Sequence, residues 1–215
     1  MAAARKPGTA TLRRALSRAV GQSDRAERQL AIAAVLGDAL RPLGAELIVV
    51  GGAAVEIYTH GGYSTDDLDL VGPSGPAVSA VLESLGFRRL GKDFIHDALH
   101  LYVEFPSATL APNMRSAVLR TGKRTVTLVS REDLIIDRLC AYKFWRSAID
   151  GVNALLLLED GRLDETHLHL RAAQEDVADA LAAVRECAEE VIRLRLSKDR
   201  ANALLEARMR KLSGA

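Results

Sequence analysis

The sequence predicts a mixed α/β (α+β) fold in which a region of strands and helices is followed by a region of helices alone. Two observations predict this division. Short segments with the pattern of β-strands lie between residues 46 and 129, and residues 131–212 show helical patterns only. The composition, 48% hydrophobic and 27% charged residues over 215 positions, provides enough apolar side chains for a core. We therefore expect a first domain over 1–130 and a C-terminal helical region over 131–215.

The N-terminal segment predicts two helices. Apolar residues every four positions indicate a helix over 9–20, and a second helix is expected over about 25–41, with Ser23 or Asp24 as its N-cap. The second helix should end near Pro42, because proline lacks the N–H that a helix interior requires.

Five segments have the character of strands. The first is nearly all apolar and β-branched, which suits a strand that is buried on both faces. The second alternates acidic and apolar residues with the period of a half-buried strand. The last two flank Thr-Gly-Lys and predict a hairpin. The strands are expected over 46–50, 67–71, 99–105, 117–120 and 125–129, with short helices over about 53–58 and 76–85 between them.

The C-terminal region predicts helices throughout. Ser130-Arg-Glu-Asp133 has the form of a capping box, with Asp in place of the usual Glu or Gln, and opens a helix that ends near Trp145. Helical patterns then continue to residue 212, including a long stretch over 175–196. Tyr142 and Trp145 are expected to lie in the core rather than to stack on nucleobases.

The net charge of +1 conceals two basic ends. Residues 1–28 carry seven Lys and Arg against two acids, and residues 193–215 carry the same numbers, so the middle of the chain is acidic. Clustered positive charge attracts polyanions through the release of counterions. The ends either bind a nucleic acid or are ordinary solvated helix faces, and the charge pattern allows both interpretations.

The sequence shows no sign of export or of insertion into a membrane. No apolar run reaches the roughly 18–20 residues that span a bilayer. The N-terminus continues into Arg-rich sequence instead of the apolar block of a secretory signal. Cys140 and Cys187 lie 47 positions apart in helical sequence and predict no disulfide. We expect a cytoplasmic protein without a membrane partner.

The most informative pattern is a strand, a Gly-Gly pair and a later strand with two acids. Asp67 and Asp69 are two positions apart on a strand, so both carboxylates should point to one face. Two like charges there call for a cation, and Mg²⁺ binds carboxylates together with water and substrate phosphates. Gly51 and Gly52 would let backbone N–H groups at a helix start approach a phosphate closely. Glu104 could complete the metal site or act as a general base.

These residues resemble the signature of a known superfamily. Val50-Gly-Gly-Ala-Ala-Val55, the loop Gly61–Thr65 and Asp67-Leu-Asp-Leu-Val71 are similar to the motifs of DNA polymerase β-type nucleotidyltransferases. Residues 129–141 resemble a helix of AbiEii-like minimal nucleotidyltransferases, a group that includes the MenT-like toxins of type IV toxin–antitoxin systems. The resemblance implies a nucleotidyltransferase-fold mixed sheet with flanking helices, which the C-terminal helical region follows.

The resemblance also implies a chemistry and a set of site residues. A nucleoside monophosphate would move from an NTP to an acceptor hydroxyl, with Mg²⁺ as the cofactor. Arg138 stands where AbiEii-like proteins usually carry Lys, and of the family's Arg-Asp-x-x-Asp pattern only Asp150 is retained. The implied catalytic and metal-binding residues are Asp67, Asp69 and Glu104, and the implied nucleotide- and phosphate-binding residues are Gly51, Gly52, Thr65, Arg138, Lys143 and Asp150.

Three classes of function are compatible with this pattern. The first is transfer to RNA, such as the 3′ end of a tRNA, by the toxin of a toxin–antitoxin pair, with an antitoxin protein as a further partner. The second is the modification of a small hydroxylated molecule, such as an aminoglycoside, or of a protein side chain. The third is an inactive relative that binds a nucleotide or a partner without turnover. The basic ends favour RNA.

Overall fold

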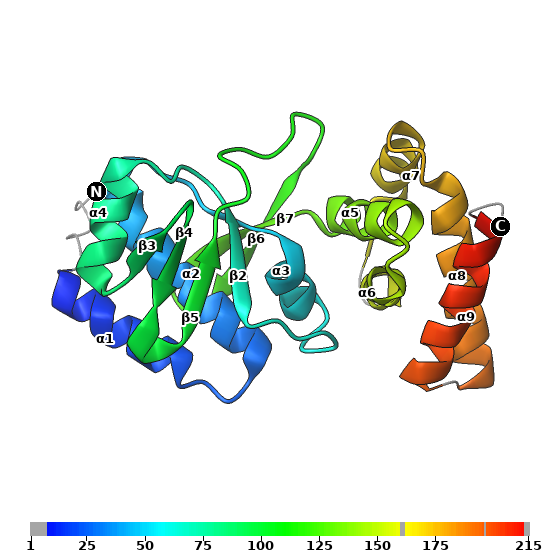
Figure 1. Cartoon of the computed structure of the whole chain (residues 1–215), viewed down its shortest axis with the longest axis horizontal. Coiled ribbons are helices and arrows are strands. Elements are labelled where there is room, and N and C mark those ends of the chain that lie inside the picture. The colour runs from blue at the N-terminus through cyan, green and yellow to red at the C-terminus, as the bar shows by residue number, and fades with distance from the viewer. Residues whose placement is uncertain (1–7, 160–161, 196, 213–215) are drawn as a thin grey trace. The chain divides into compact units, whose positions relative to one another are not determined.

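The computed structural model describes residues 8–159, 162–195 and 197–212. The chain divides into two compact units, Met1–Val129 and Ser130–Ala215. In the described part of the chain, the first unit contains a sheet with helices and the second contains helices only (Figure 1). The predicted mixed α/β fold is therefore confirmed.

The described strands of the first unit form one seven-stranded mixed sheet. They are β1 (Ile48–Val49), β2 (Asp67–Val71), β3 (Arg88–Leu90), β4 (Asp93–His96), β5 (Leu101–Glu104), β6 (Ser116–Thr121) and β7 (Arg124–Val129). Their order across the sheet is β3-β4-β5-β2-β1-β7-β6. The pairs β1–β7 and β2–β5 are parallel, and the other neighbours are antiparallel. The strand with the two acids therefore lies in the middle of the sheet.

The helices of the first unit gather around one central helix. They are α1 (Thr9–Val20), α2 (Arg25–Leu40), α3 (Gly51–Tyr58) and α4 (Pro76–Leu85), with short 3-10 turns at Arg41–Leu43 and Asp97–Leu99. The central helix, α2, packs against β6 and β7 and also against α1, α3 and α4. Sheet residues that face this side, such as Leu68, Leu70 and Phe94, are fully or almost fully buried. The core of the unit lies between this face of the sheet and the helices.

Capping residues explain the bounds of α2. Of the two candidate caps, Asp24 is the N-cap, and its side chain accepts a hydrogen bond from the N–H of Glu27. The helix ends at Leu40, because Pro42 lies in the following 3-10 turn and Gly44 adopts a left-handed conformation with φ of 70°.

The described part of the second unit consists of helices, and the first of them is capped at its N-terminus. The described helices are α5 (Arg131–Phe144), α6 (Ala148–Glu159), α7 (Glu165–Gln174), α8 (Ala178–Leu194) and α9 (Lys198–Leu212). The hydroxyl oxygen of Ser130 accepts a hydrogen bond from the N–H of Asp133 and so caps α5. The expected long helix over 175–196 starts later, because Asp176 has a φ of 54°, which no α-helix accommodates. Within the described ranges, every helix is too short or too polar to cross a bilayer.

The two aromatic residues expected in the core differ in burial. Tyr142 is fully buried, and its hydroxyl donates a hydrogen bond to the carbonyl of Leu205 over 2.7 Å. Trp145 is 84% exposed, so its expected place in the core is wrong. The reason is that α5 ends at Phe144, and the positive φ of Arg146 (55°) then turns the chain. Trp145 follows the last helical residue and no longer belongs to the buried stripe.

Candidate functional site

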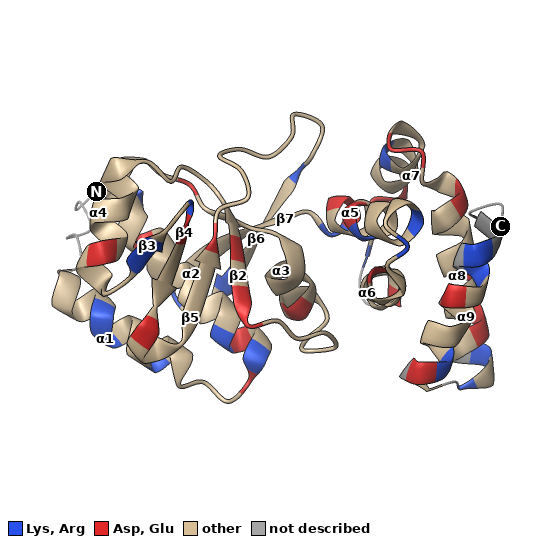
Figure 2. Ribbon diagram, viewed as in Figure 1, with Lys and Arg blue, Asp and Glu red and all other residues tan. Residues whose placement is uncertain are grey.

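Strand β2 presents its two acids on the sheet face opposite to the core. Leu68 and Leu70 are buried beneath the helices, whereas Asp67 and Asp69 are partly exposed. The ribbon of β2 is largely red in Figure 2, where red marks Asp and Glu. The two carboxylates therefore share one face of the central strand.

The turn from β1 into α3 lies against Asp69. The N–H of Gly52 donates a hydrogen bond to Oδ2 of Asp69 over 3.1 Å. Gly51 has a φ of 58°, and a Cβ added to it would lie 2.2 Å from the same oxygen. Only glycine both adopts this conformation readily and leaves room for the carboxylate. The N–H of Val50 also donates to the carbonyl oxygen of Asp69, over 3.0 Å, so the turn is joined to β2 by its backbone.

Thr65 lies between this turn and Asp67. Its Oγ1 accepts a hydrogen bond from the N–H of Asp67 over 3.3 Å. Its Cβ and Cγ2 would each lie 3.3 Å from a Cβ added to Gly52. The structure therefore brings Thr65 and the Gly-Gly turn close to the strand that carries Asp67 and Asp69. Each of these residues was predicted to belong to the site.

Strands β5 and β4 bring further acids near β2. Glu104 lies opposite Asp69 in the parallel pairing of the two strands. On the other side, the register of β4 and β5 pairs Phe94 with Val103, so Asp93 comes next to Glu104. Burial, followed by the negative charges of Asp93 and Asp67, raises the pKa of Glu104.

Asp93 is a member of this acidic group that the sequence did not reveal. Its carboxylate accepts hydrogen bonds from the hydroxyl of Tyr102 and from the N–H of Phe105, each over 3.2 Å. The apolar pair Phe94-Ile95 between Asp93 and His96, with Phe94 buried, is the signal that could have identified the strand.

The acids of β2 suit a magnesium ion whose remaining ligands come from water and substrate. No three His, Cys, Asp or Glu side chains among the described residues are placed to hold a metal ion by themselves. Mg²⁺ in nucleotide enzymes commonly uses only one or two carboxylates and takes its other ligands from water and phosphates. Asp67 and Asp69 fit this mode. The pKa of the neighbouring Glu104 is raised by burial and then by the negative charges of Asp93 and Asp67. The role of Glu104 as a third ligand stays a prediction.

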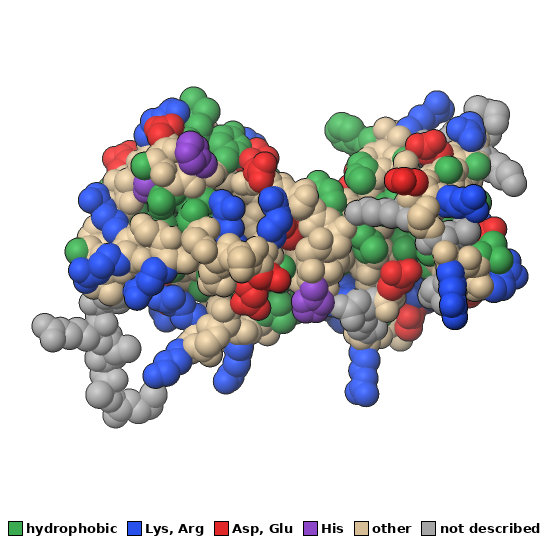
Figure 3. All heavy atoms as spheres, turned by 90° about the horizontal axis from the view of Figure 1, so that it is seen from below, with side chains coloured by type: hydrophobic (Ala, Val, Ile, Leu, Met, Phe, Trp, Pro, Cys, Tyr) green, Lys and Arg blue, Asp and Glu red, His purple; other side chains and the backbone are tan. Residues whose placement is uncertain are grey.

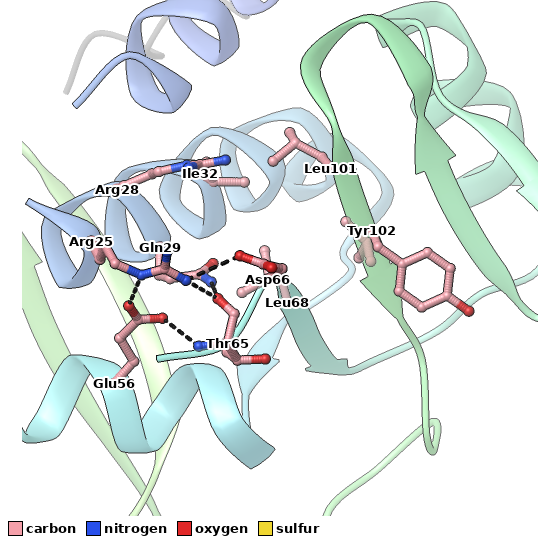
Figure 4. Close-up of a pocket in the computed structure, with 11 residues that line it drawn as sticks. Arg25, Arg28, Gln29, Ile32, Glu56, Thr65, Asp66, Leu68, Leu101 and Tyr102 are labelled. Atoms are coloured by element: carbon pink, nitrogen blue, oxygen red, sulfur yellow. Dashed lines mark hydrogen bonds and ion pairs between the residues drawn. The ribbon is translucent and has the colours of Figure 1, made fainter. Parts of the chain in front are cut away.

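A buried acid on α3 was also missed. Glu56 is fully buried, and it contacts Arg25 and the backbone of Thr65 (Figure 4). A single acid within the otherwise apolar helix Gly51–Tyr58 is an unusual feature that the sequence does show. Its partner Arg25 lies 31 positions away, so the contact itself could not be predicted.

The remaining predicted site residues lie in the second unit and are paired there. Arg138 contacts Asp137 and also donates to Oδ1 of Asp150 over 2.7 Å. Lys143 donates to Oδ1 of Asp179 over 3.0 Å, and its Nζ lies 5.3 Å from the ring centre of Phe144. Arg138 and Lys143 are thus paired with nearby acids, and phosphate binding by Arg138, Lys143 and Asp150 stays a prediction.

Comparison with known proteins shows a similarity of fold. No protein-family model and no curated protein matches the sequence. The structure is similar to the crystal structure of an antigenic nucleotidyltransferase-like protein from Paracoccidioides brasiliensis, with a TM-score of 0.55 and 16% sequence identity over 86% of this chain and 94% of that chain. The chain has a nucleotidyltransferase-like fold. The similarity does not extend to the AbiEii-like or MenT-like subtype, which stays a prediction.

Proposed function

We propose that the protein is a Mg²⁺-dependent nucleotidyltransferase that transfers a nucleoside monophosphate from an NTP to an acceptor hydroxyl and releases pyrophosphate. The observation that carries the proposal is the contact between Asp69 and the N–H of Gly52, on a nucleotidyltransferase-like fold. It joins a pair of carboxylates to the N-terminus of a helix, where N–H groups and the helix dipole favour phosphate.

Each residue of the site has a role in this proposal. Asp67 and Asp69 hold the cation, which when bound stabilises the charge of the attacking and leaving oxygens. Gly51 and Gly52 present backbone N–H groups to the triphosphate. Glu104 accepts a proton from the acceptor hydroxyl, for which its raised pKa is suited.

Replacement of Asp67 tests the chemistry. The purified protein is incubated with each of four labelled NTPs, Mg²⁺ and total tRNA. Asp67→Ala should lower the rate of transfer by at least about 100-fold, because it removes charge stabilisation at the reacting phosphate. Asp66→Ala is the matched control, since this neighbouring carboxylate is 92% exposed and should leave the rate unchanged. Transfer by Asp67→Ala at the native rate would contradict the mechanism.

We propose RNA, such as the 3′ end of a tRNA, as the acceptor. Helix α1 carries Arg13, Arg14 and Arg18 and no acid. Figure 3 shows several Lys and Arg side chains on the face of the first unit that is in view. In α9, by contrast, Arg208 is paired with Glu186 and Glu190 of α8. The N-terminal basic helix is therefore the better candidate for contact with RNA phosphates.

Salt dependence tests the RNA proposal. Each phosphate contact releases counterions, so RNA affinity should fall at least about tenfold between about 50 and 300 mM salt. Arg14→Ala with Arg18→Ala should weaken RNA binding and reduce the salt slope, while the transfer of label to water or to a small acceptor stays unchanged. Label that appears in an aminoglycoside or in a protein instead of RNA would assign the acceptor to those classes.

The resemblance of residues 129–141 to MenT-like toxins extends the proposal to growth inhibition with an antitoxin as partner. Induced expression should stop growth, and Asp67→Ala should abolish the effect at equal protein level. Normal growth during expression of the active protein would reject the toxin role and leave the nucleotidyltransferase proposal intact.

A further inference from the structure

The two carboxylate oxygens of Glu56 accept hydrogen bonds from different elements, one from a helix and one from a loop. Oε1 accepts a hydrogen bond from Nε of Arg25 on α2 over 2.8 Å, and Oε2 accepts one from the N–H of Thr65 over 3.3 Å (Figure 4). The side chain of Glu56 is 0% exposed. The side chain of Arg25 is 46% exposed, so only the Glu56 end of this ion pair is shielded from water. A buried carboxylate depends on its hydrogen bonds, because the loss of a partner leaves its charge unsatisfied.

Arg25 and its neighbour hold the other side of the same peptide. Nη2 of Arg25 donates to the carbonyl of Thr65 over 2.9 Å, and Nε2 of Gln29 donates to the same oxygen over 3.2 Å. Strand β2 begins only at Asp67, so Thr65 lies outside the strand ladder. Side chains from two helices thus supply the hydrogen bonds that a neighbouring strand would supply within a sheet.

The clamped residue touches both halves of the proposed site. Its Oγ1 bonds the N–H of Asp67, and its side chain packs against Gly52. The cavity beside these side chains has a volume of about 10 Å³, room for about one water molecule. With so little free space beside the clamp, a change in it should move Thr65 and thereby alter the spacing between the Gly-Gly turn and Asp67.

An acid at position 56 is not what packing alone would select. Taking a carboxylate out of water costs free energy that a charged partner repays only in part. Glu56 lies in an otherwise apolar helix among buried neighbours such as Val55 and Ile57. Its carboxylate therefore contributes a specific geometry more than it contributes free energy of folding.

We propose, on the basis of the proposed function, that Glu56 is a positioning residue. It clamps Thr65 through Arg25 and so sets Asp67 and Asp69 at the distance from Gly52 that metal-bound triphosphate requires. It does not touch the reacting atoms. The arrangement makes the catalytic rate and the affinity for the metal depend on a carboxylate on the far side of the loop.

Two carboxylates that contact the same arginine provide a matched test. Glu56→Gln removes the buried charge and leaves one of its two partners, Arg25 or the Thr65 N–H, without an acceptor. Asp66→Asn removes the exposed charge, which lies 3.1 Å from Nη2 of Arg25. Each variant is assayed for kcat and KM with NTP, for folded fraction by circular dichroism, and for Mn²⁺ affinity by electron paramagnetic resonance with a non-hydrolysable NTP analogue.

The proposal predicts that Glu56→Gln lowers kcat at least about tenfold per folded molecule, with KM for NTP changed less than kcat, and weakens Mn²⁺ binding. Asp66→Asn should match the native protein in all three. Native kcat and Mn²⁺ affinity in folded Glu56→Gln would overturn the proposal, as would a loss of activity that only follows the loss of folded protein.

A second variant covers failure of the first to fold. Arg25→Lys keeps a positive charge for Glu56 but lacks the planar fork that also reaches the Thr65 carbonyl. It should lower kcat and Mn²⁺ affinity, and native values in this variant would overturn the proposal. Failure of the underlying function has a different signature, namely equal Mn²⁺ affinity in the native protein and in Asp67→Ala, with neither transferring label.

Discussion

At the first turn of α3, the backbone N–H of Gly52 donates a hydrogen bond to the carboxylate of Asp69 over 3.1 Å. One side chain thus links the strand that carries the acids to the turn that the fold offers to phosphate. Its charge and its hydrogen-bonding capacity can be separated by mutation, because an amide oxygen accepts the same bond without the charge.

Asp69→Asn should leave the fold intact and remove activity. The asparagine oxygen keeps an acceptor for Gly52, so the free energy of unfolding should change by no more than about 1 kcal/mol. Loss of the charge should lower NMP transfer at least about 100-fold. Urea unfolding and transfer from labelled NTP measure the two effects. Near-native transfer would show that the charge of Asp69 is dispensable.

Gly51→Ala should be more harmful than Gly122→Ala, although both glycines have a φ of 58°. A left-handed conformation costs an L-residue about 1–2 kcal/mol at either position. A Cβ at Gly122 meets nothing within 4 Å, whereas at Gly51 it meets Oδ2 of Asp69 at 2.2 Å. Gly122→Ala should therefore lose stability only, and Gly51→Ala should lose activity as well. Equal activity of the two variants in the transfer assay would show that the close contact between Gly51 and Asp69 is not needed for activity.

The thiols should be slow to react. Burial raises the pKa of Cys140 to about 11 from an ordinary value of 9.0, and burial also raises the pKa of Cys187. Since the thiolate is the reactive form, folded Cys140 at pH 8 should react with Ellman's reagent about 100-fold more slowly than in guanidinium. The rate should rise about tenfold per pH unit until the pH approaches the folded pKa.

The same shift has a consequence for stability. The unfolded thiol loses its proton near pH 9, whereas the folded thiol of Cys140 keeps it up to about pH 11. The contribution of Cys140 to the free energy of unfolding is therefore fully present below pH 9 and is lost as the pH rises from about 9 to about 11. Cys140→Ala should show a smaller decline over the same range in urea unfolding, and an identical decline would contradict the shift.

Asp133 should be important for the stability of the helical unit. It is 1% exposed, and its carboxylate oxygens bond the hydroxyl of Ser130, Nε2 of His167 and Nε of Arg171 over 2.8–3.0 Å. Asp133→Ala should cost about 3–5 kcal/mol, because it leaves a buried arginine without its main partner.

The control for Asp133 is an exposed ion pair in the same unit. Arg185 pairs with Glu165, whose side chain is 54% exposed, so Arg185→Ala should cost less than about 1 kcal/mol. Chemical unfolding followed by circular dichroism compares the two variants. Similar losses of unfolding free energy in the two variants would show that the buried contacts of Asp133 stabilise the unit no more than an exposed ion pair does.

Local pattern was sufficient to predict the elements that carry their own signals. The alternation over Asp67–Val71 predicts a strand with a buried and an acidic face, and that strand is β2. The sequence on either side of Gly122 predicts the β6–β7 hairpin. Gly86, with a φ of 105°, ends α4 at the residue before it, as expected.

Elements without such signals were missed for identifiable reasons. All three residues of Arg88–Leu90 are exposed, because β3 is an edge strand, so no apolar alternation marks it. The clamp on Thr65 joins residues from α2, α3 and a loop, and its long-range pairing leaves no periodic trace in the sequence. Trp145 shows the opposite error, since an apolar side chain at the end of a helix need not continue the buried stripe.

The contact between Asp69 and Gly52 has a consequence for which anions the turn accepts. A free sulfate or inorganic phosphate meets a carboxylate that already uses the N–H, and like charges repel. A nucleotide that arrives with its own cation offers Asp69 a stronger partner and thereby frees the backbone donor. We expect the turn to discriminate against metal-free anions, so that common cellular phosphates compete poorly with nucleotide.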